Sequence, residues 1–308
     1  MRFRELFAPL RRLTLEEDGA DWPNRWASRM VSAGGVDWHV QIMGDGLSLL
    51  LLHGTGASTH SWRDLAPLLA TRFRVIAPDL PGHGFSSSGG ARTQSMRGMA
   101  HALAALLGAL DATPETVVGH SAGAAILARL ALDETFKPKR IIALNGALSP
   151  FEGAAGHMLP TLAKALFLNP LAPRLFACSA DHHAVARLLQ GTGSRLDADG
   201  VALYARLFRN NAHVDGALGM MAHWDLHGLN RDLPRLRTPI DFVLAENDAT
   251  VPPITTRALA SKLANARVHL VPGLGHLAHE EAPSLFAQYI FDIANSDTET
   301  IGRSPSRV

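Results

Sequence analysis

A serine, an acid and a histidine stand in the sequence where they could form a nucleophilic site. Ser121 lies at the centre of a G-x-S-x-G run, GHSAG at residues 119–123, between a predicted strand and a predicted helix. Asp248 follows a later predicted strand, and His276 lies in a glycine-rich turn after the last one. A serine hydroxyl attacks a carbonyl only when a base takes its proton and an acid orients that base. The order therefore predicts catalytic roles for Ser121, Asp248 and His276.

Two neighbouring residues compete for the acid and base roles. Glu246 could replace Asp248 geometrically, but it belongs to the end of the predicted strand. His279 could replace His276, but it lies where the following helix begins, so we interpret it as a supporting or surface residue. The other position for such an acid, after the strand at residues 140–144, is occupied by an asparagine.

The negatively charged oxygen of an acyl-transfer intermediate needs two N–H donors. The N–H of Ala122, at the start of the helix after the serine, is one predicted donor. The second is the N–H of Thr55 in the loop HGTG at residues 53–56, where glycines allow the backbone to turn inward. We interpret His53 of this loop as a structural hydrogen-bonding residue rather than a catalyst.

Other chemistries have weaker support. No G-x-G-x-x-G follows a strand, no Walker A pattern is present and no H-E-x-x-H occurs. His223 and His227 are spaced i, i+4 near Asp225, but no third ligand is evident, so a polar helix face is the favoured interpretation. The single cysteine, Cys178, allows no intramolecular disulfide and no cysteine-based metal site. The sequence therefore predicts neither a metal nor a cofactor.

Short apolar runs alternate with helical patterns along most of the chain, which is typical of a mostly parallel α/β sheet. The predicted strands are residues 29–32, 38–43, 47–52, 74–77, 116–118, 140–144, 240–245 and 267–271, and the predicted helices are 62–71, 95–110, 124–134 and 283–294. A leucine-, alanine- and proline-rich stretch without strand signals interrupts this alternation. We therefore predict an N-terminal extension (1–28), an α/β core (29–147 and 231–295), a helical cap (148–230) and a flexible tail (296–308).

The predicted cap is rich in large apolar side chains. They either line an adaptable apolar pocket or form the core of the cap itself. These candidate pocket residues are Phe151, Met158, Phe167, Phe176, Met220, Met221 and Trp224.

Charge and hydropathy exclude several classes of protein. Lysine and arginine total 29 against 28 aspartates and glutamates, a net charge of +1, which argues against a nucleic-acid binder. No apolar run approaches the roughly 20 residues of a transmembrane helix, and charges interrupt the first residues, so a cytoplasmic location is favoured.

Residues 1–13 nevertheless form a basic amphipathic stretch. It would pack on its own domain or touch a membrane surface. The apolar members of the stretch are Phe3, Leu6, Phe7, Leu10 and Leu13.

Five motifs in this order resemble the α/β-hydrolase family over about residues 29–295. They are HGTG (53–56), PDLPGHGFS (78–86), GHSAG (119–123), ENDATVPP (246–253) and GLGHLAHEEAP (273–283). More narrowly, the chain resembles the magnesium-chelatase accessory proteins of bacteriochlorophyll biosynthesis. Stretches of the N-terminal extension and of the cap carry that likeness, among them QGTGSRLDADGVALYARLFRN and HVDGALGMMAHWDL.

The resemblance implies an α/β-hydrolase fold with a helical cap and a role in pigment synthesis around magnesium insertion. It also implies magnesium chelatase subunits as partners and a hydrophobic, tetrapyrrole-related molecule as substrate. Three hypotheses remain open. The first is a serine hydrolase of a hydrophobic ester or thioester, with the serine favouring this over chemistry that needs an aspartate nucleophile. The second is a porphyrin carrier with an idle triad, and the third is a C–C bond hydrolase.

Overall fold

The computed structural model describes residues 10–150, 166, 168–169 and 171–301, with side chains described to residue 295. An eight-stranded sheet in the order β1-β2-β4-β3-β5-β6-β7-β8 forms its centre. Its strands are β1 (Ser28–Ala33), β2 (Val36–Met43), β3 (Ser48–Leu52), β4 (Arg74–Pro78), β5 (Thr116–His120), β6 (Arg140–Leu144), β7 (Ile240–Ala245) and β8 (Ala266–Val271). The β1–β2 and β2–β4 pairs are antiparallel, and all later pairs are parallel. The predicted, mostly parallel α/β sheet is confirmed.

The two faces of the sheet carry separate apolar cores because side chains alternate along a strand. Leu50 and Leu52 of β3 belong to a buried cluster that includes side chains of the helices α3 (Met96–Ala109) and α4 (Ala122–Leu132). Leu49 and Leu51 belong to the opposite cluster, with side chains of α2 (Leu65–Leu69) and α13 (Pro283–Ile301). This burial on both faces explains why β3 is apolar at four consecutive positions.

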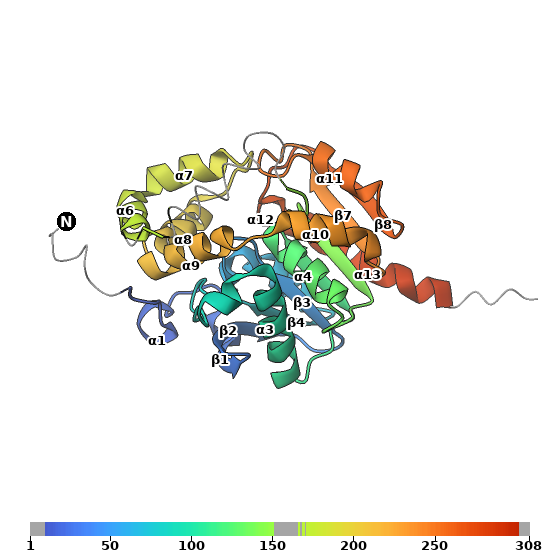
Figure 1. Ribbon diagram of the computed structural model, residues 1–308, viewed down its shortest axis with the longest axis horizontal. Coiled ribbons are helices and arrows are strands. Elements are labelled where there is room, and N and C mark those ends of the chain that lie inside the picture. The colour runs from blue at the N-terminus through green and yellow to red at the C-terminus, as the bar shows by residue number, and fades with distance from the viewer. Residues whose placement is uncertain (1–9, 151–165, 167, 170, 302–308) are drawn as a thin grey trace, which may run out of the picture.

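Helices between β6 and β7 form the part of the chain that was predicted to be a cap. Its described elements are α6 (Ala172–Ser179), α7 (His182–Gln190), α8 (Ala198–Phe208), α9 (Asn211–Ala222) and most of α10 (Leu226–Asp232). The 3-10 turn η5 (Leu233–Arg235) follows, in the part predicted to be core. Figure 1 shows α6 to α9 gathered on one side of the core. The remaining elements are α1 (Leu15–Asp18), η2 (Arg25–Ala27), η3 (Thr59–Trp62), η4 (Ala91–Gln94), α11 (Pro253–Ala260) and α12 (Ala278–Glu281).

Two predicted helices have different lengths in the structure. The helix expected over residues 62–71 is divided into η3 and the short α2. A continuous helix would place Pro67 in its interior, where proline has no N–H to donate to the preceding turn. The last helix continues to Ile301 instead of ending near residue 294, and no glycine or proline interrupts residues 284–301.

The N-terminal amphipathic stretch is partly described. Leu13 is buried in a cluster with Trp22, Phe85 and Leu207, so this member of the apolar stripe packs on the protein instead of facing a membrane. Leu10 is exposed, and residues 1–9 lie outside the described part of the chain. Within the described residues, none of the helices is both long enough and apolar enough to cross a bilayer.

Candidate active site

Ser121 occupies a tight turn between β5 and α4. Its backbone angles are φ 52° and ψ −119°, a left-handed conformation that is uncommon for a residue with a Cβ. The glycines on either side are required by the packing: a Cβ on Gly119 would lie 2.5 Å from the nitrogen of Ala124, and one on Gly123 would lie 2.2 Å from the carbonyl oxygen of Leu52. The turn therefore has the strained geometry that presents a serine at the end of a strand.

The predicted acid and base are joined by a hydrogen bond. Asp248 follows β7, His276 follows β8, and His276 Nδ1 lies 2.7 Å from Asp248 Oδ2. The other carboxylate oxygen, Oδ1, accepts the N–H groups of Thr250 and Val251, each at 2.8 Å. Because a carboxylate only accepts, Nδ1 donates, and Nε2 of the neutral ring is left as an acceptor. This is the tautomer that a general base requires.

Ser121 and His276 line the same pocket. In the described chain no hydrogen bond links the Ser121 hydroxyl to the His276 ring. Such bonds are often long in the free form of an enzyme and tighten when substrate binds. The pair is therefore close enough to share a ligand, although the proton-transfer contact is not formed.

The predicted oxyanion donors lie in the same pocket as Ser121. Ala122 is the first residue of α4, so its N–H has no acceptor within the helix. Thr55 lies in a loop that His53 anchors: His53 Nε2 accepts the N–H of Leu80 at 2.8 Å, and Nδ1 donates to the Gly54 carbonyl at 2.8 Å. His53 thus holds the loop that carries Thr55.

The backbone of His276 is fixed from the sheet side. Its carbonyl oxygen accepts His120 Nε2 at 2.9 Å and Asn145 Nδ2 at 2.8 Å. His120 is buried next to Ser121 in the chain. Burial is the main reason why the pKa of His120 lies well below its usual value, and electrostatic repulsion from His279 and His276 lowers it further. His120 therefore stays neutral and donates a hydrogen bond to the loop that carries His276, here called the base loop (residues 272–277).

His279, interpreted from the sequence as a supporting or surface residue, is not at the surface. Its ring is 1% exposed, packs on Trp62, and its Nε2 lies 2.9 Å from Ser61 Oγ. Burial lowers the pKa of His279 to about 3. Glu246, the rejected alternative acid, is exposed, and it accepts the N–H of Gly273 instead of contacting the histidine.

The pocket around Ser121 encloses about 310 Å³ and is mainly apolar. Of the predicted pocket residues, Met221 and Trp224 line it. Met220 does not: it is fully buried, with its sulfur 3.5 Å from Thr55 Oγ1, because adjacent helical residues point in different directions. Phe176 is also absent from this lining, and its ring contacts Phe208 edge to face. Phe151, Met158 and Phe167 lie outside the described residues.

Sequence reasoning missed several lining residues. Val251 lies three residues after Asp248 and Leu277 directly follows His276, so proximity along the chain could have identified them. Leu188 and Leu189 of α7 and Phe208 of α8 carried no comparable signal. None of the described lining residues is Lys, Arg, Asp or Glu.

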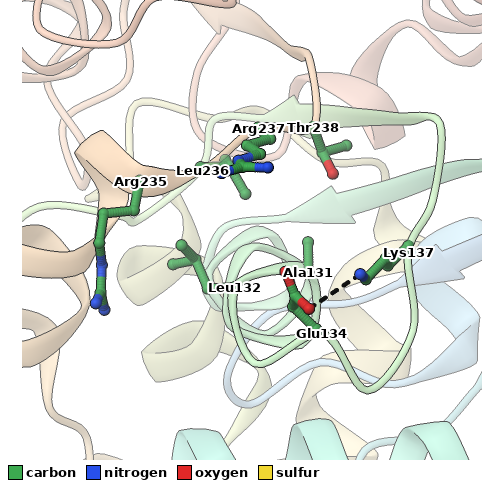
Figure 2. A pocket seen from close by; sticks show the side chains of 8 residues that line it. All are labelled: Ala131, Leu132, Glu134, Lys137, Arg235, Leu236, Arg237 and Thr238. Carbon is green, nitrogen blue, oxygen red and sulfur yellow. Dashed lines mark hydrogen bonds and ion pairs between the residues drawn. The ribbon is translucent and has the colours of Figure 1, made fainter.

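A second pocket, of about 400 Å³, lies at the opposite end of the sheet. Figure 2 shows its lining, which includes the ion pair of Lys137 and Glu134 at 3.0 Å. Arg235, Arg237 and Thr238 complete its polar side. These residues precede β6 and β7, whereas the predicted catalytic residues follow the carboxyl ends of β5, β7 and β8. Among the described residues, no group of three histidine, cysteine or acidic side chains is placed to hold a metal ion.

Comparisons with known proteins agree with this architecture. Residues 48–283 match the family model described as alpha/beta hydrolase fold. The chain is 42% identical over 276 residues to the magnesium-chelatase 30 kDa subunit of Rhodobacter capsulatus, covering 89% of this chain and 96% of that protein.

Solved structures are similar as well. An alpha/beta hydrolase fold protein from Burkholderia ambifaria superposes with a TM-score of 0.73 at 25% identity, over 86% of this chain and 97% of its own. A thermophilic esterase from Thermogutta terrifontis gives 0.70 at 22% identity, over 87% and 98%. The resemblance predicted from the sequence is thus confirmed: the chain belongs to the α/β-hydrolase family and is a relative of the magnesium-chelatase 30 kDa subunit.

Proposed function

We propose that the protein is a serine hydrolase that cleaves an ester or thioester of a bulky hydrophobic substrate. The observation that carries this proposal is the hydrogen bond of His276 Nδ1 to Asp248 Oδ2, because His276 lines the same pocket as Ser121. In the neutral ring, an Nδ1 that donates to Asp248 leaves Nε2 as the acceptor that the Ser121 hydroxyl needs.

The proposed reaction follows the order of these groups. His276 takes the Ser121 proton as the hydroxyl oxygen attacks the carbonyl carbon, and the oxyanion is received by the N–H groups of Thr55 and Ala122. His276 then protonates the leaving alcohol or thiol, which departs and leaves an acyl-serine. Water, deprotonated by the same imidazole, attacks this acyl group and releases the acid and the free serine.

The lining of the pocket supports an uncharged, apolar group as the part of the substrate that enters. Leu188, Phe208, Met221, Trp224 and Val251 supply apolar surface, and no ionised side chain appears among the described lining residues. A free carboxylate buried there would lose its hydration without a cationic partner. A tetrapyrrole-related substrate would therefore enter through an esterified or otherwise neutral side chain.

We place this activity in bacteriochlorophyll synthesis, near the magnesium chelatase step. The support is the 42% identity to a protein named as a chelatase subunit. The same likeness makes chelatase subunits the proposed partners. A location in the cytoplasm, with contact to the photosynthetic membrane through residues 1–13, belongs to the same proposal.

Covalent labelling tests the hydrolase chemistry directly. A fluorophosphonate probe should label the wild-type protein, and Ser121→Ala should abolish labelling. Ser179→Ala is the matched control, because this serine is exposed on α6 and its hydroxyl donates to the Phe176 carbonyl. Folding of each variant is checked by circular dichroism.

Two further measurements distinguish the other hypotheses. Absence of labelling, together with an absorbance shift on adding protoporphyrin, would overturn the hydrolase proposal in favour of a carrier. Cleavage of β-diketones, with no cleavage of esters or thioesters, would identify a C–C bond hydrolase instead.

Deletion of the gene, with identification of the pigment intermediates that accumulate, tests the place in the pathway. Accumulation of a precursor that precedes or follows magnesium insertion is expected.

A further inference from the structure

The loop between α7 and α8, residues 192–195, touches both halves of the proposed acid–base pair. The carbonyl oxygen of Thr192 accepts two N–H groups, that of Ala249 at 3.2 Å and that of His276 at 3.3 Å. Ala249 directly follows Asp248. One carbonyl of the cap therefore ties the acid turn to the base loop.

Close backbone packing fixes the position of this loop. Gly193 has φ +86°, and a Cβ at this position would lie 2.0 Å from the carbonyl oxygen of Asn247. On the other side, a Cβ on Gly275 would lie 2.2 Å from the carbonyl carbon of Gly193. Both glycines are thus required for the loop to enter between the residues that precede the acid and the base.

Side-chain hydrogen bonds hold the same junction. Ser194 is 1% exposed, and its hydroxyl oxygen accepts the N–H of Leu277 at 2.7 Å. The Glu281 carboxylate accepts the N–H groups of Gly275 and Arg195, each at 3.0 Å. The loop that carries His276 is therefore bonded directly to the cap at His276 and Leu277, and Gly275 is linked to it through Glu281.

We infer that residues 192–195 are a positioning element for catalysis and set the separation and angle of Asp248 and His276. The inference rests on the proposed hydrolase function, because it assigns the loop an effect on that acid–base pair. These residues act through the pair and touch no reacting atom. A displacement of about 1 Å in a catalytic group lowers a rate by about 100-fold, so small shifts of the loop are sufficient to matter.

Two variants test the inference with different severity. Gly193→Ala forces the loop away from Asn247 and should lower the fluorophosphonate labelling rate and kcat by about 100-fold, with little change in KM. Ser194→Ala removes one acceptor of a buried N–H and should lower both by roughly threefold to tenfold. The matched control is Gly191→Ala, which has φ −60° and meets only carbonyls of its own preceding helical turn. It should label at the wild-type rate.

A spectroscopic readout separates positioning from a general loss of folding. The downfield proton resonance of the His276 Nδ1–H should shift or broaden in Gly193→Ala and in Ser194→Ala, and remain unchanged in Gly191→Ala. Unchanged labelling rates and an unchanged resonance in Ser194→Ala would overturn the inference, even if Gly193→Ala does not fold. Failure of the wild-type protein to react with the probe would instead contradict the proposed function, and the resonance would still test the contact.

Discussion

Replacing Asp248 with asparagine should nearly abolish hydrolysis while leaving the fold intact. The reason lies in how the two carboxylate oxygens are used. Oδ1 accepts the N–H groups of Thr250 and Val251, both at 2.8 Å, and Oδ2 accepts from His276 Nδ1 at 2.7 Å. In Asp248→Asn the amide oxygen must take the Oδ1 position, because an NH₂ group there would face two donors. The NH₂ group then faces His276.

A donor facing Nδ1 forces the other tautomer of His276. Nδ1 must then be the acceptor, and the proton moves to Nε2, which can no longer take the proton of Ser121. The same exchange in a Ser-His-Asp triad lowers kcat by about 10⁴-fold, or about 5.4 kcal/mol of activation free energy. The free energy of unfolding should change by much less, because the volume and the two Oδ1 hydrogen bonds are retained.

The assay compares the second-order rate of fluorophosphonate labelling in the wild type, Asp248→Asn and Glu246→Gln. Glu246→Gln is the matched carboxylate-to-amide control, because Glu246 is exposed and contacts the Gly273 N–H rather than His276. It should remain within about twofold of the wild type. Thermal unfolding of all three proteins establishes that the folds are comparable. If Asp248→Asn is labelled within tenfold of the wild-type rate, His276 is not the working base or Asp248 does not orient it, and the reasoning fails.

Two further predictions concern the pocket and the pH dependence of stability. Met221→Ala should raise KM for long-chain p-nitrophenyl esters with little effect on unfolding, whereas Met220→Ala should cost about 2–5 kcal/mol of stability, because Met221 lines the pocket and Met220 is fully buried. Denaturant titration and ester kinetics check both, and equal effects on stability would contradict the assignment. Burial lowers the pKa of His213 to about 4 and of His279 to about 3, so the unfolded chain binds more protons below pH 6.5 and stability should fall as the pH drops, by up to about 1.4 kcal/mol per pH unit for each ring. Burial raises the pKa of Glu280, which opposes this trend, and chemical denaturation between pH 7 and pH 4.5 measures the balance. A denaturation midpoint that does not change with pH over that range would contradict the predicted loss of stability.

Most of the sheet and the neighbourhood of the candidate site could be predicted because the signals are local. Short apolar runs followed by glycine- or proline-rich turns identified each strand. Parallel strands bring their carboxyl ends to one edge, so the residues after β5, β7 and β8 had to lie near one another. The structure accordingly joins Asp248 to His276 and places His276 in the pocket that Ser121 lines, although the catalytic roles of the three remain predictions.

The errors arose where burial depends on distant contacts. His279 stands in a polar stretch, and its contacts with Trp62 and with Ser61, 218 residues away, place it in the interior. Small and apolar residues occur on every side of α9, so its sequence does not show which face is buried. The sequence therefore predicts the same pocket role for Met220 and Met221. Residues 192–195 belong to a stretch that carries the family resemblance, but nothing in their composition predicts backbone packing against Asn247 and Gly275.

The cap contacts suggest how substrate enters. Besides the 192–195 loop, His213 of α9 ties the cap to the loop at residues 53–56. Its Nε2 donates to the Gly56 carbonyl at 3.1 Å, and its Nδ1 accepts the N–H of Gly84 at 3.0 Å. A cap that swung away as a rigid lid would break these contacts to the proposed acid–base pair and to the loop of the proposed oxyanion donor Thr55. Leu188 and Met221, however, line the pocket while remaining 50% and 39% exposed. We therefore expect substrate to enter between α7 and α9 by movement of these side chains, with the cap backbone held in place.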